Sequence, residues 1–122
     1  MADEAFHQTR PFIVPTEDAK LIEEHFGVAS HGVADASIAH MVAPAHWSEP
    51  AQKPEFDEYT LMVRGSMQVE LPEDTRTVSA GESILVPAGT TVRYANPFSV
   101  EAEYWSVCIP AFTPERAHRT SD

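Results

Sequence analysis

From residue 37 onward, hydrophobic and polar residues alternate in short segments, a pattern typical of β-strands rather than helices. In one such segment, Met67, Val69 and Leu71 alternate with polar residues, so that one face of a strand would be apolar. Glycines and prolines between the segments favour turns. Short strands at near-regular spacing predict an all-β barrel or jelly roll. The strands are predicted at 37–43, 58–64, 67–71, 75–79, 83–86, 91–95 and 101–109.

The N-terminal region shows a different pattern. Residues 1–15 are predicted to form an extended arm, because an apolar stretch is bounded there by two prolines. After it, Thr16 is suited to cap a short helix, which is predicted to run through about His25. The apolar residues of that helix would share one face, and Gly27 is suited to end it.

The length of 122 residues fits one domain with a single core. Pro110 and Pro114 are expected to end regular structure, so His118 near the C-terminus is expected to be solvated. We therefore predict three parts within the one domain: the arm and helix over 1–36, the barrel over 37–112 and a tail over 113–122.

Composition and charge narrow the classes of partner. The formal net charge is −11, from 8 basic and 19 acidic residues. That charge argues against nucleic acids and anionic membrane surfaces, since both require a basic surface. A single cysteine, Cys108, excludes an internal disulfide and a cysteine-rich zinc site. No apolar run is long enough to span a membrane, and the first residues lack the features of a signal peptide, so we expect a cytoplasmic protein.

Two segments carry turn residues at characteristic spacings. Glu58 is followed after six residues by Gly65, and further along Gly81 is followed by Pro87-x-Gly89 and then by Asn96. These segments resemble the two motifs of the cupin family. The resemblance covers roughly residues 37–110 and implies a small, RmlC-like cupin, a double-stranded β-helix or jelly-roll barrel closed over one cavity.

In cupins, three histidines and one glutamate usually bind a metal. The resemblance places the glutamate at Glu58 and the histidine of the second motif at Val92, which cannot bind metal. The histidine pair of the first motif falls on Gln52 and Pro54, or on residues 51 and 53 if the spacing is one residue longer. The usual three-histidine site is therefore not expected.

A non-standard divalent metal stays open as an alternative. Glu58, Gln52 and His46 would be its ligands, and further donors are available from His40, Glu55, Asp57 and Glu103. Because such a set is rich in oxygen, it would favour manganese, magnesium or calcium.

A second, shorter resemblance supports a cupin that is poor in histidine. The runs 56–59 and 109–112, together with Gly65, are similar to the cupin domain of the ethanolamine-utilisation proteins. That domain also lacks the histidines and has acidic residues in its barrel, and members of the group have been assigned phosphotransfer to acetate.

The strand pattern indicates which side chains face the cavity. Glu58 shares one face with Thr60 and Met62, and burial there would raise the pKa of its carboxyl group. A carboxyl group in that setting can act as a general acid or base. The structural alternative is a carboxylate bonded to Arg64, Arg93 or a backbone amide.

Further ligand contacts are expected from two strands and from the proline-rich loop at 44–56, which would lie at the barrel mouth. For the aromatic residues among them, packing in the core is the alternative. The predicted ligand-binding residues are Gln52, Glu55, Tyr94, Trp105 and Trp47.

Three functions follow from these expectations. The first is a cupin that binds a small molecule without the usual metal, with Glu58 as polar anchor of an otherwise apolar cavity. The second is an enzyme acting on a small organic acid or a sugar-like substrate, with Glu58 as general base or metal ligand. The third is a protein-interaction module with a vestigial cavity. Small cupins are often homodimers, and the apolar stretch at 11–14 is expected to exchange between protomers.

Overall fold

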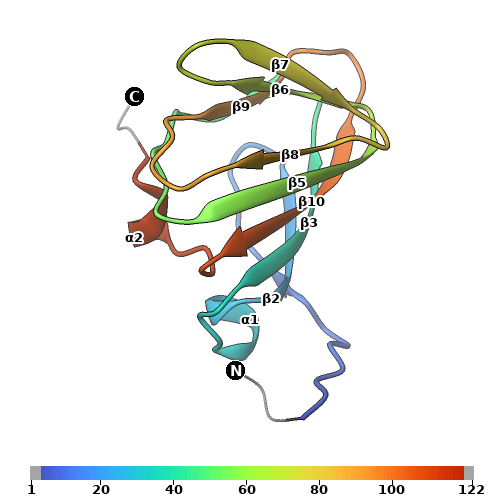
Figure 1. Ribbon diagram of the computed structural model, residues 1–122. Coiled ribbons are helices and arrows are strands. Elements are labelled where there is room, and N and C mark those ends of the chain that lie inside the picture. The colour runs from blue at the N-terminus through green and yellow to red at the C-terminus, as the bar shows by residue number, and fades with distance from the viewer. Residues whose placement is uncertain (1–3, 120–122) are drawn as a thin grey trace.

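The computed structural model describes residues 4–119 and consists mainly of β-strands in two antiparallel sheets (Figure 1). The all-β class predicted from the alternating pattern is therefore confirmed. The described residues contain two short helices, α1 (Val28–His31) and α2 (Pro114–Ala117). The strands are β1 (Phe12–Ile13), β2 (Leu21–Phe26), β3 (Ser37–Ala43), β4 (Trp47–Ser48), β5 (Asp57–Arg64), β6 (Ser66–Glu70), β7 (Thr75–Ser79), β8 (Ser83–Val86), β9 (Arg93–Asn96) and β10 (Ala102–Ile109).

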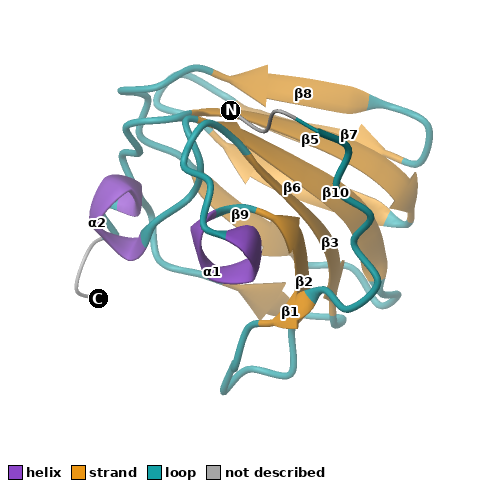
Figure 2. Cartoon of the chain, turned by 90° about the horizontal axis from the view of Figure 1, so that it is seen from below, coloured by secondary structure: helices purple, strands orange, loops and turns teal. Residues whose placement is uncertain are grey.

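The order of the strands shows a jelly roll. One sheet has the order β1-β2-β3-β10-β5-β8 and the other has the order β4-β9-β6-β7, so many neighbours are distant in sequence. Strand β10 pairs with β3 on one side and with β5 on the other along nearly its whole length. The two sheets enclose the core, and both helices lie outside the strands (Figure 2). Met67 and Val69 of β6 are fully buried there, as their alternation predicted.

The predicted helix from Thr16 to about His25 is wrong. Most of that segment is β2, which pairs antiparallel with β3 and with the short β1. Before it, Thr16 Oγ1 donates to the backbone oxygen of Lys20, so this residue closes a loop instead of capping a helix. Because backbone pairing with β3 decides the conformation, tertiary context overrides the local helical pattern. The N-terminal helix is α1, which Gly27 precedes rather than ends.

The C-terminal segment is also ordered differently from the expectation. Pro114 begins α2, and Thr113 caps this helix by accepting a hydrogen bond from the backbone N–H of Arg116. Ala117 is buried, and the backbone oxygen of His118 accepts from the N–H of Lys53. The prediction that regular structure ends before Pro114 is therefore wrong, because this proline occupies the first turn of a helix, where its missing N–H costs nothing.

The asparagine of the second motif has a structural role at the end of β9. Asn96 is fully buried, and its side-chain amide donates to the backbone oxygens of Ala43, Pro44 and Val100. Its side-chain oxygen accepts from the backbone N–H of Phe98. One side chain thus satisfies four backbone groups where three chain segments meet, and it joins the two sheets at this edge.

Neither helix within residues 4–119 could span a membrane, since each is only four residues long.

The glycines of the two motifs differ in the space around them. Gly65 and Gly81 both have a left-handed backbone, with φ of 76° and 84°. A Cβ on Gly65 would lie 2.3 Å from the backbone oxygen of Glu101, whereas one on Gly81 would meet no heavy atom within 4 Å. Gly65 is therefore required by both conformation and space, and Gly81 by conformation alone.

We predict that Gly65→Ala destabilises the protein more than Gly81→Ala. The left-handed conformation should cost an alanine about 1–2 kcal/mol at either site. At Gly65 the close contact between the new Cβ and the backbone oxygen of Glu101 should add at least about 1 kcal/mol to this loss of stability, because both atoms are held by the backbone. Urea denaturation of both variants measures the difference, and equal losses would contradict the steric role of Gly65.

Candidate functional site

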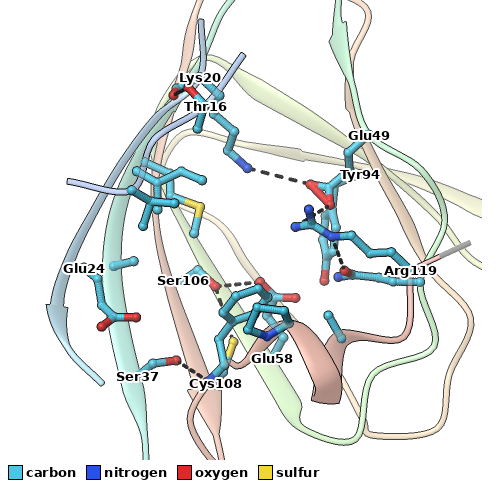
Figure 3. A pocket seen from close by; sticks show the side chains of 18 of the residues that line it. Thr16, Lys20, Glu24, Ser37, Glu49, Glu58, Tyr94, Ser106, Cys108 and Arg119 are labelled. Atoms are coloured by element: carbon cyan, nitrogen blue, oxygen red, sulfur yellow. Dashed lines mark hydrogen bonds and ion pairs between the residues drawn. The ribbon is translucent and has the colours of Figure 1, made fainter. Parts of the chain in front are cut away.

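A cavity of about 910 Å³ lies inside the barrel. Its wall is formed by the inward faces of β2, β3, β5, β9 and β10, by the loop before β2 and by the C-terminal segment. Its volume is at the upper end of the range of about 300–1,000 Å³ that is usual for small-molecule sites. Figure 3 shows polar side chains from these separate segments converging on this space.

Glu58 of β5 lies in the cavity wall, on the face shared with Thr60, as the strand pattern predicted. Its Oε2 accepts a hydrogen bond of 2.6 Å from Ser106 Oγ of the neighbouring β10. Its Oε1 is buried and has no hydrogen-bond partner among residues 4–119. Burial raises the pKa of the Glu58 carboxyl group, and the hydrogen bond from Ser106 opposes this effect only in part.

The expected structural partners of Glu58 lie elsewhere. Arg64 pairs with Glu101 and Glu103 at the surface, and Arg93 binds Glu70 at 2.6 Å. The alternative in which an arginine neutralises Glu58 is therefore wrong. Both arginines lie on strand faces that point away from the cavity.

Tyr94 of β9 places a second unpaired polar atom in the same wall. Its hydroxyl is buried and has no hydrogen-bond partner among the described residues. Burial raises the pKa of this hydroxyl, and the nearby carboxyl group of Glu58 raises it further, so the phenol stays protonated. The Glu58 and Tyr94 side chains lie close enough for a weak mutual hydrogen bond to affect the pKa of each. Neither Glu58 Oε1 nor the Tyr94 hydroxyl makes a hydrogen bond of normal geometry within residues 4–119.

Lys20 contributes a buried cation that the sequence did not reveal. Only 8% of the residue is exposed, and its Nζ lies 3.7 Å from Glu49 Oε1 (Figure 3). The ammonium group also lies over the ring of Trp47 at 4.2 Å and near that of Tyr104 at 5.5 Å. Burial lowers the pKa of Lys20, but Tyr104 and Glu49 together raise it above its ordinary value, so the group is charged at neutral pH.

Arg119 brings a second cation to the same carboxylate. Its Nη2 lies 3.6 Å from Glu49 Oε2, and its Nε donates to Gln52 Oε1 at 3.4 Å. Glu49 thus connects the loop before β2, the proline-rich loop and the C-terminal segment. Sequence reasoning missed all three charged residues, because their contacts join residues 29 positions apart (Lys20 and Glu49) and 70 positions apart (Glu49 and Arg119), and no local pattern marks them.

The rest of the wall combines apolar side chains with the carboxylates of Glu17, Asp18, Glu24 and Glu115, and it has small polar groups beside Glu58. Cys108 and Ser106 of β10 share the inward face, and their side chains lie 3.8 Å apart. Burial raises the pKa of the Cys108 thiol far above its ordinary value, which leaves it a poor nucleophile. The hydroxyl group of Ser37 already has a hydrogen-bond partner, because it accepts from the backbone N–H of Phe112.

The structure brings together four of the residues selected from the sequence. Glu58, Gln52, Tyr94 and Trp47 all line the cavity. The indole N–H of Trp47 donates to Asp18 Oδ2 at 2.7 Å, which leaves the ring face toward Lys20.

Two predicted contacts lie outside the cavity. Trp105 is on the outer face of β10, between the rings of His25 and His40, because Tyr104, Ser106 and Cys108 take the inward positions. Glu55 is exposed and forms an ion pair with His118 at the surface. His118 is exposed, as the sequence suggested, but it also lines the cavity and pairs with Glu55.

The alternative set of metal ligands is not assembled. Gln52 and Glu58 both line the cavity, but His46 does not, and its backbone N–H donates to Phe98 in a loop. His40 is held on the outer face between Glu23 and Glu103, at 2.7 and 2.8 Å. Within residues 4–119, three or more His, Cys, Asp or Glu side chains nowhere come together as a metal site would require.

No protein-family model matches the chain. A protein of Myxococcus xanthus named endoribonuclease YbeY is 46% identical over 106 residues, a match that covers 87% of this chain. The chain spans 36% of the length of this curated relative.

Solved structures settle the fold. A cupin 2 conserved barrel domain protein from Salinispora arenicola matches with a TM-score of 0.64 and 13% identity, over 89% of this chain and 88% of that one. The chain has the cupin fold. A putative ethanolamine utilization protein Q from Salmonella typhimurium matches with a TM-score of 0.60 and 16% identity, over 76% of this chain and 71% of that one. The cupin resemblance read from the two motifs is therefore confirmed.

Two positions that the cupin resemblance assigns to histidines, Val92 and, under the shorter of the two spacings, Gln52, are neighbours in space. Gln52 and Val92 pair as an isolated antiparallel bridge, with both N–H···O distances at 2.9 Å. The resemblance places Gln52 in the first motif and Val92 in the second, so the two motif segments are paired in this chain although neither residue carries an imidazole. Val92 is buried as part of the hydrophobic core.

We predict that Glu58→Gln becomes more stable relative to the wild-type protein as pH rises. The pKa of Glu58 is raised above its ordinary value of 4.5, so folding favours the protonated form. The stability that this proton contributes is present below pH 4.5 and is lost as pH rises through the folded pKa. The difference in free energy of unfolding between the variant and the wild type should change by up to about 1.4 kcal/mol per pH unit. Urea denaturation of both proteins between acidic and neutral pH measures it, and a constant difference would contradict the raised pKa.

Proposed function

We propose that this cupin binds a small organic molecule in its barrel cavity and does so without the usual three-histidine metal site. The observation that carries the proposal is the pair of unpaired polar atoms in the wall, Glu58 Oε1 and the Tyr94 hydroxyl. Leaving a polar atom buried and unpaired costs about 1–3 kcal/mol. A ligand that hydrogen-bonds to both atoms would remove that cost, and the cavity volume leaves room for it.

An enzymatic role is the second candidate, and the setting of Glu58 favours it. Burial raises the pKa of the Glu58 carboxyl group, and a carboxyl group that holds its proton more tightly than usual beside a ligand can give or take a proton. Glu58 would then act as general acid or base on the bound molecule. The Tyr94 hydroxyl would orient that molecule.

The endoribonuclease name belongs to the Myxococcus xanthus relative, of which this chain spans 36%. Contacts with RNA depend on cationic groups that meet phosphates, and the chain has a formal charge of −11. We propose that an endoribonuclease activity of that relative resides in the part of it that this chain does not match. The cytoplasm remains the expected location.

We predict that filling the cavity abolishes binding. Ala39 lies on the inward face of β3, so Ala39→Phe would place a ring in the cavity where space is available. In a thermal-shift screen of small neutral, anionic and cationic organic compounds, those that stabilise the wild type should no longer stabilise this variant.

Ala88→Phe is the matched control, since Ala88 is exposed and lies outside the cavity. It should respond to the same compounds as the wild type. Compounds that stabilise Ala39→Phe as strongly as the wild type would bind elsewhere and would contradict the proposal.

We further propose that this cupin forms a homodimer through the outer face of its larger sheet. Register places Leu85, Tyr59, Val107 and Ile38 side by side across four strands on that face. In the next row Leu61 lies beside Trp105. Exposed apolar surface of this extent is typical of an interaction site. A two-fold axis through the face would pair these residues with their copies. The stretch at 11–14 is not needed for this contact, because its strand β1 pairs with β2 of the same chain.

We predict that Leu61→Glu converts the dimer to a monomer, because it would place a charge in the apolar contact. Leu61 is 45% exposed. Val100→Glu is the control, since Val100 is 59% exposed in the loop before β10. Light scattering should give a dimer mass for the wild type and the control. A monomer mass for the wild type would contradict the homodimer.

A further inference from the structure

The two ends of the polar lining offer different chemistry to a ligand. One end holds the cations Lys20 and Arg119 around Glu49, and the other holds the unpaired oxygens of Glu58 and Tyr94 (Figure 3). We infer that the ligand is a small polyhydroxylated carboxylic acid, with its carboxylate beside Lys20 and Arg119 and its hydroxyl groups at Glu58 and Tyr94. This inference rests on the proposed binding function and names its chemical class.

The cationic end has hydrogen-bond donors to spare. An ammonium group carries three donors, and the nearest oxygen of Glu49 is 3.7 Å from Lys20 Nζ. Short bonds between an ammonium and a carboxylate measure about 2.7–2.9 Å, so this ion pair uses the donors poorly. The guanidinium donors of Arg119 are used equally poorly by Glu49, since the closest contact between the two side chains is 3.6 Å. A ligand carboxylate would add the short bonds that Glu49 does not make.

The other carboxylates near Lys20 either accept hydrogen bonds from other groups or are exposed to solvent. Asp18 accepts from the indole N–H of Trp47 at 2.7 Å and from the backbone N–H of Lys20 at 3.2 Å. Glu24, further along β2, accepts from the backbone N–H of Ser30 at 2.9 Å. Glu17 and Glu115 are exposed. The Tyr104 hydroxyl accepts from one of the three donors of Lys20, and these carboxylates do not take up the others.

An amine fits this cavity less well than an acid. A ligand ammonium drawn to Glu49 would have to lie close to Lys20 and Arg119, which repel it. The aromatic faces that would attract it, Trp47 and Tyr104, already hold the ammonium of Lys20. The position a cationic ligand would take is therefore filled by the protein's own side chain.

The opposite end requires hydroxyl groups instead of an alkyl chain. A hydroxyl both donates and accepts, so it can pair with Glu58 Oε1 in either protonation state and with the Tyr94 hydroxyl. An alkyl chain there would leave both oxygens unpaired. Sites built to hydrogen-bond a hydroxyl group discriminate strongly against analogues that lack it.

Three six-carbon probes separate the two requirements in calorimetric titrations of the full chain. Gluconate has the carboxylate and the hydroxyl groups, sorbitol has the hydroxyl groups alone, and hexanoate has the carboxylate alone. We expect gluconate to bind roughly 10- to 100-fold more tightly than either of the others, because each lacks one set of bonds.

Two variants assign the subsites. We expect two substitutions, Lys20→Met and Arg119→Gln, to weaken the binding of gluconate about tenfold each and to leave the binding of sorbitol nearly unchanged. Arg119 is partly exposed, so its replacement does not put folding at risk. Tyr94→Phe should weaken gluconate and sorbitol alike and leave hexanoate unchanged. Ala39→Phe should abolish binding of gluconate.

The outcomes distinguish this inference from the proposed function. Equal affinity for gluconate and sorbitol would overturn the carboxylate subsite, and equal affinity for gluconate and hexanoate would overturn the hydroxyl subsite. No binding of gluconate up to about 10 mM would overturn the ligand class. In each case the proposed function would still stand if other compounds bound the wild type and not Ala39→Phe, and it would fail with the inference if none did.

Discussion

The pairing of β10 with β3 and β5 is the constraint on which the site depends. Since side chains alternate along a strand, this register sends Tyr104, Ser106 and Cys108 into the cavity and Trp105 to the outer face. The same register places Glu58 opposite Cys108, within reach of the Ser106 hydroxyl. A shift of one residue would exchange the cavity lining for the apolar outer face, so both proposed surfaces follow from one set of backbone hydrogen bonds.

Charged groups within this frame are held by segments outside the central strands. Lys20 comes from the loop before β2, Glu49 from the proline-rich loop and Arg119 from the C-terminal segment. Their mutual contacts are long, whereas the hydrogen bond between Ser106 and Glu58 is short. The sheets therefore supply Glu58, Tyr94 and Ser106, whereas three connecting segments supply Lys20, Glu49 and Arg119. This division is common in folds that carry their binding residues on loops.

Local sequence patterns suffice to predict some strands of this protein but not others. The strands at 75–79 and 83–86 coincide with β7 and β8, because turn residues and alternation mark both ends of each. The segment 21–26 was predicted to be helical but is a strand. Its apolar residues fit a helical face as well as a strand, and only pairing with β3 decides between the two conformations. Trp105 was predicted as a ligand contact, with packing in the core as the alternative, but the register of β10 turns it to the outer face.

By itself, the sequence determined the fold, the inward position of Glu58 and the absence of histidine from the positions that bind metal in cupins. These properties depend on turn residues, on alternation and on residue identity, which are all local. The tertiary structure alone decided that Lys20 and Arg119 meet at Glu49 and that Glu58 and Tyr94 each keep an unpaired oxygen. Such contacts join residues far apart in the chain, and no spacing along a strand or turn encodes the distance between them.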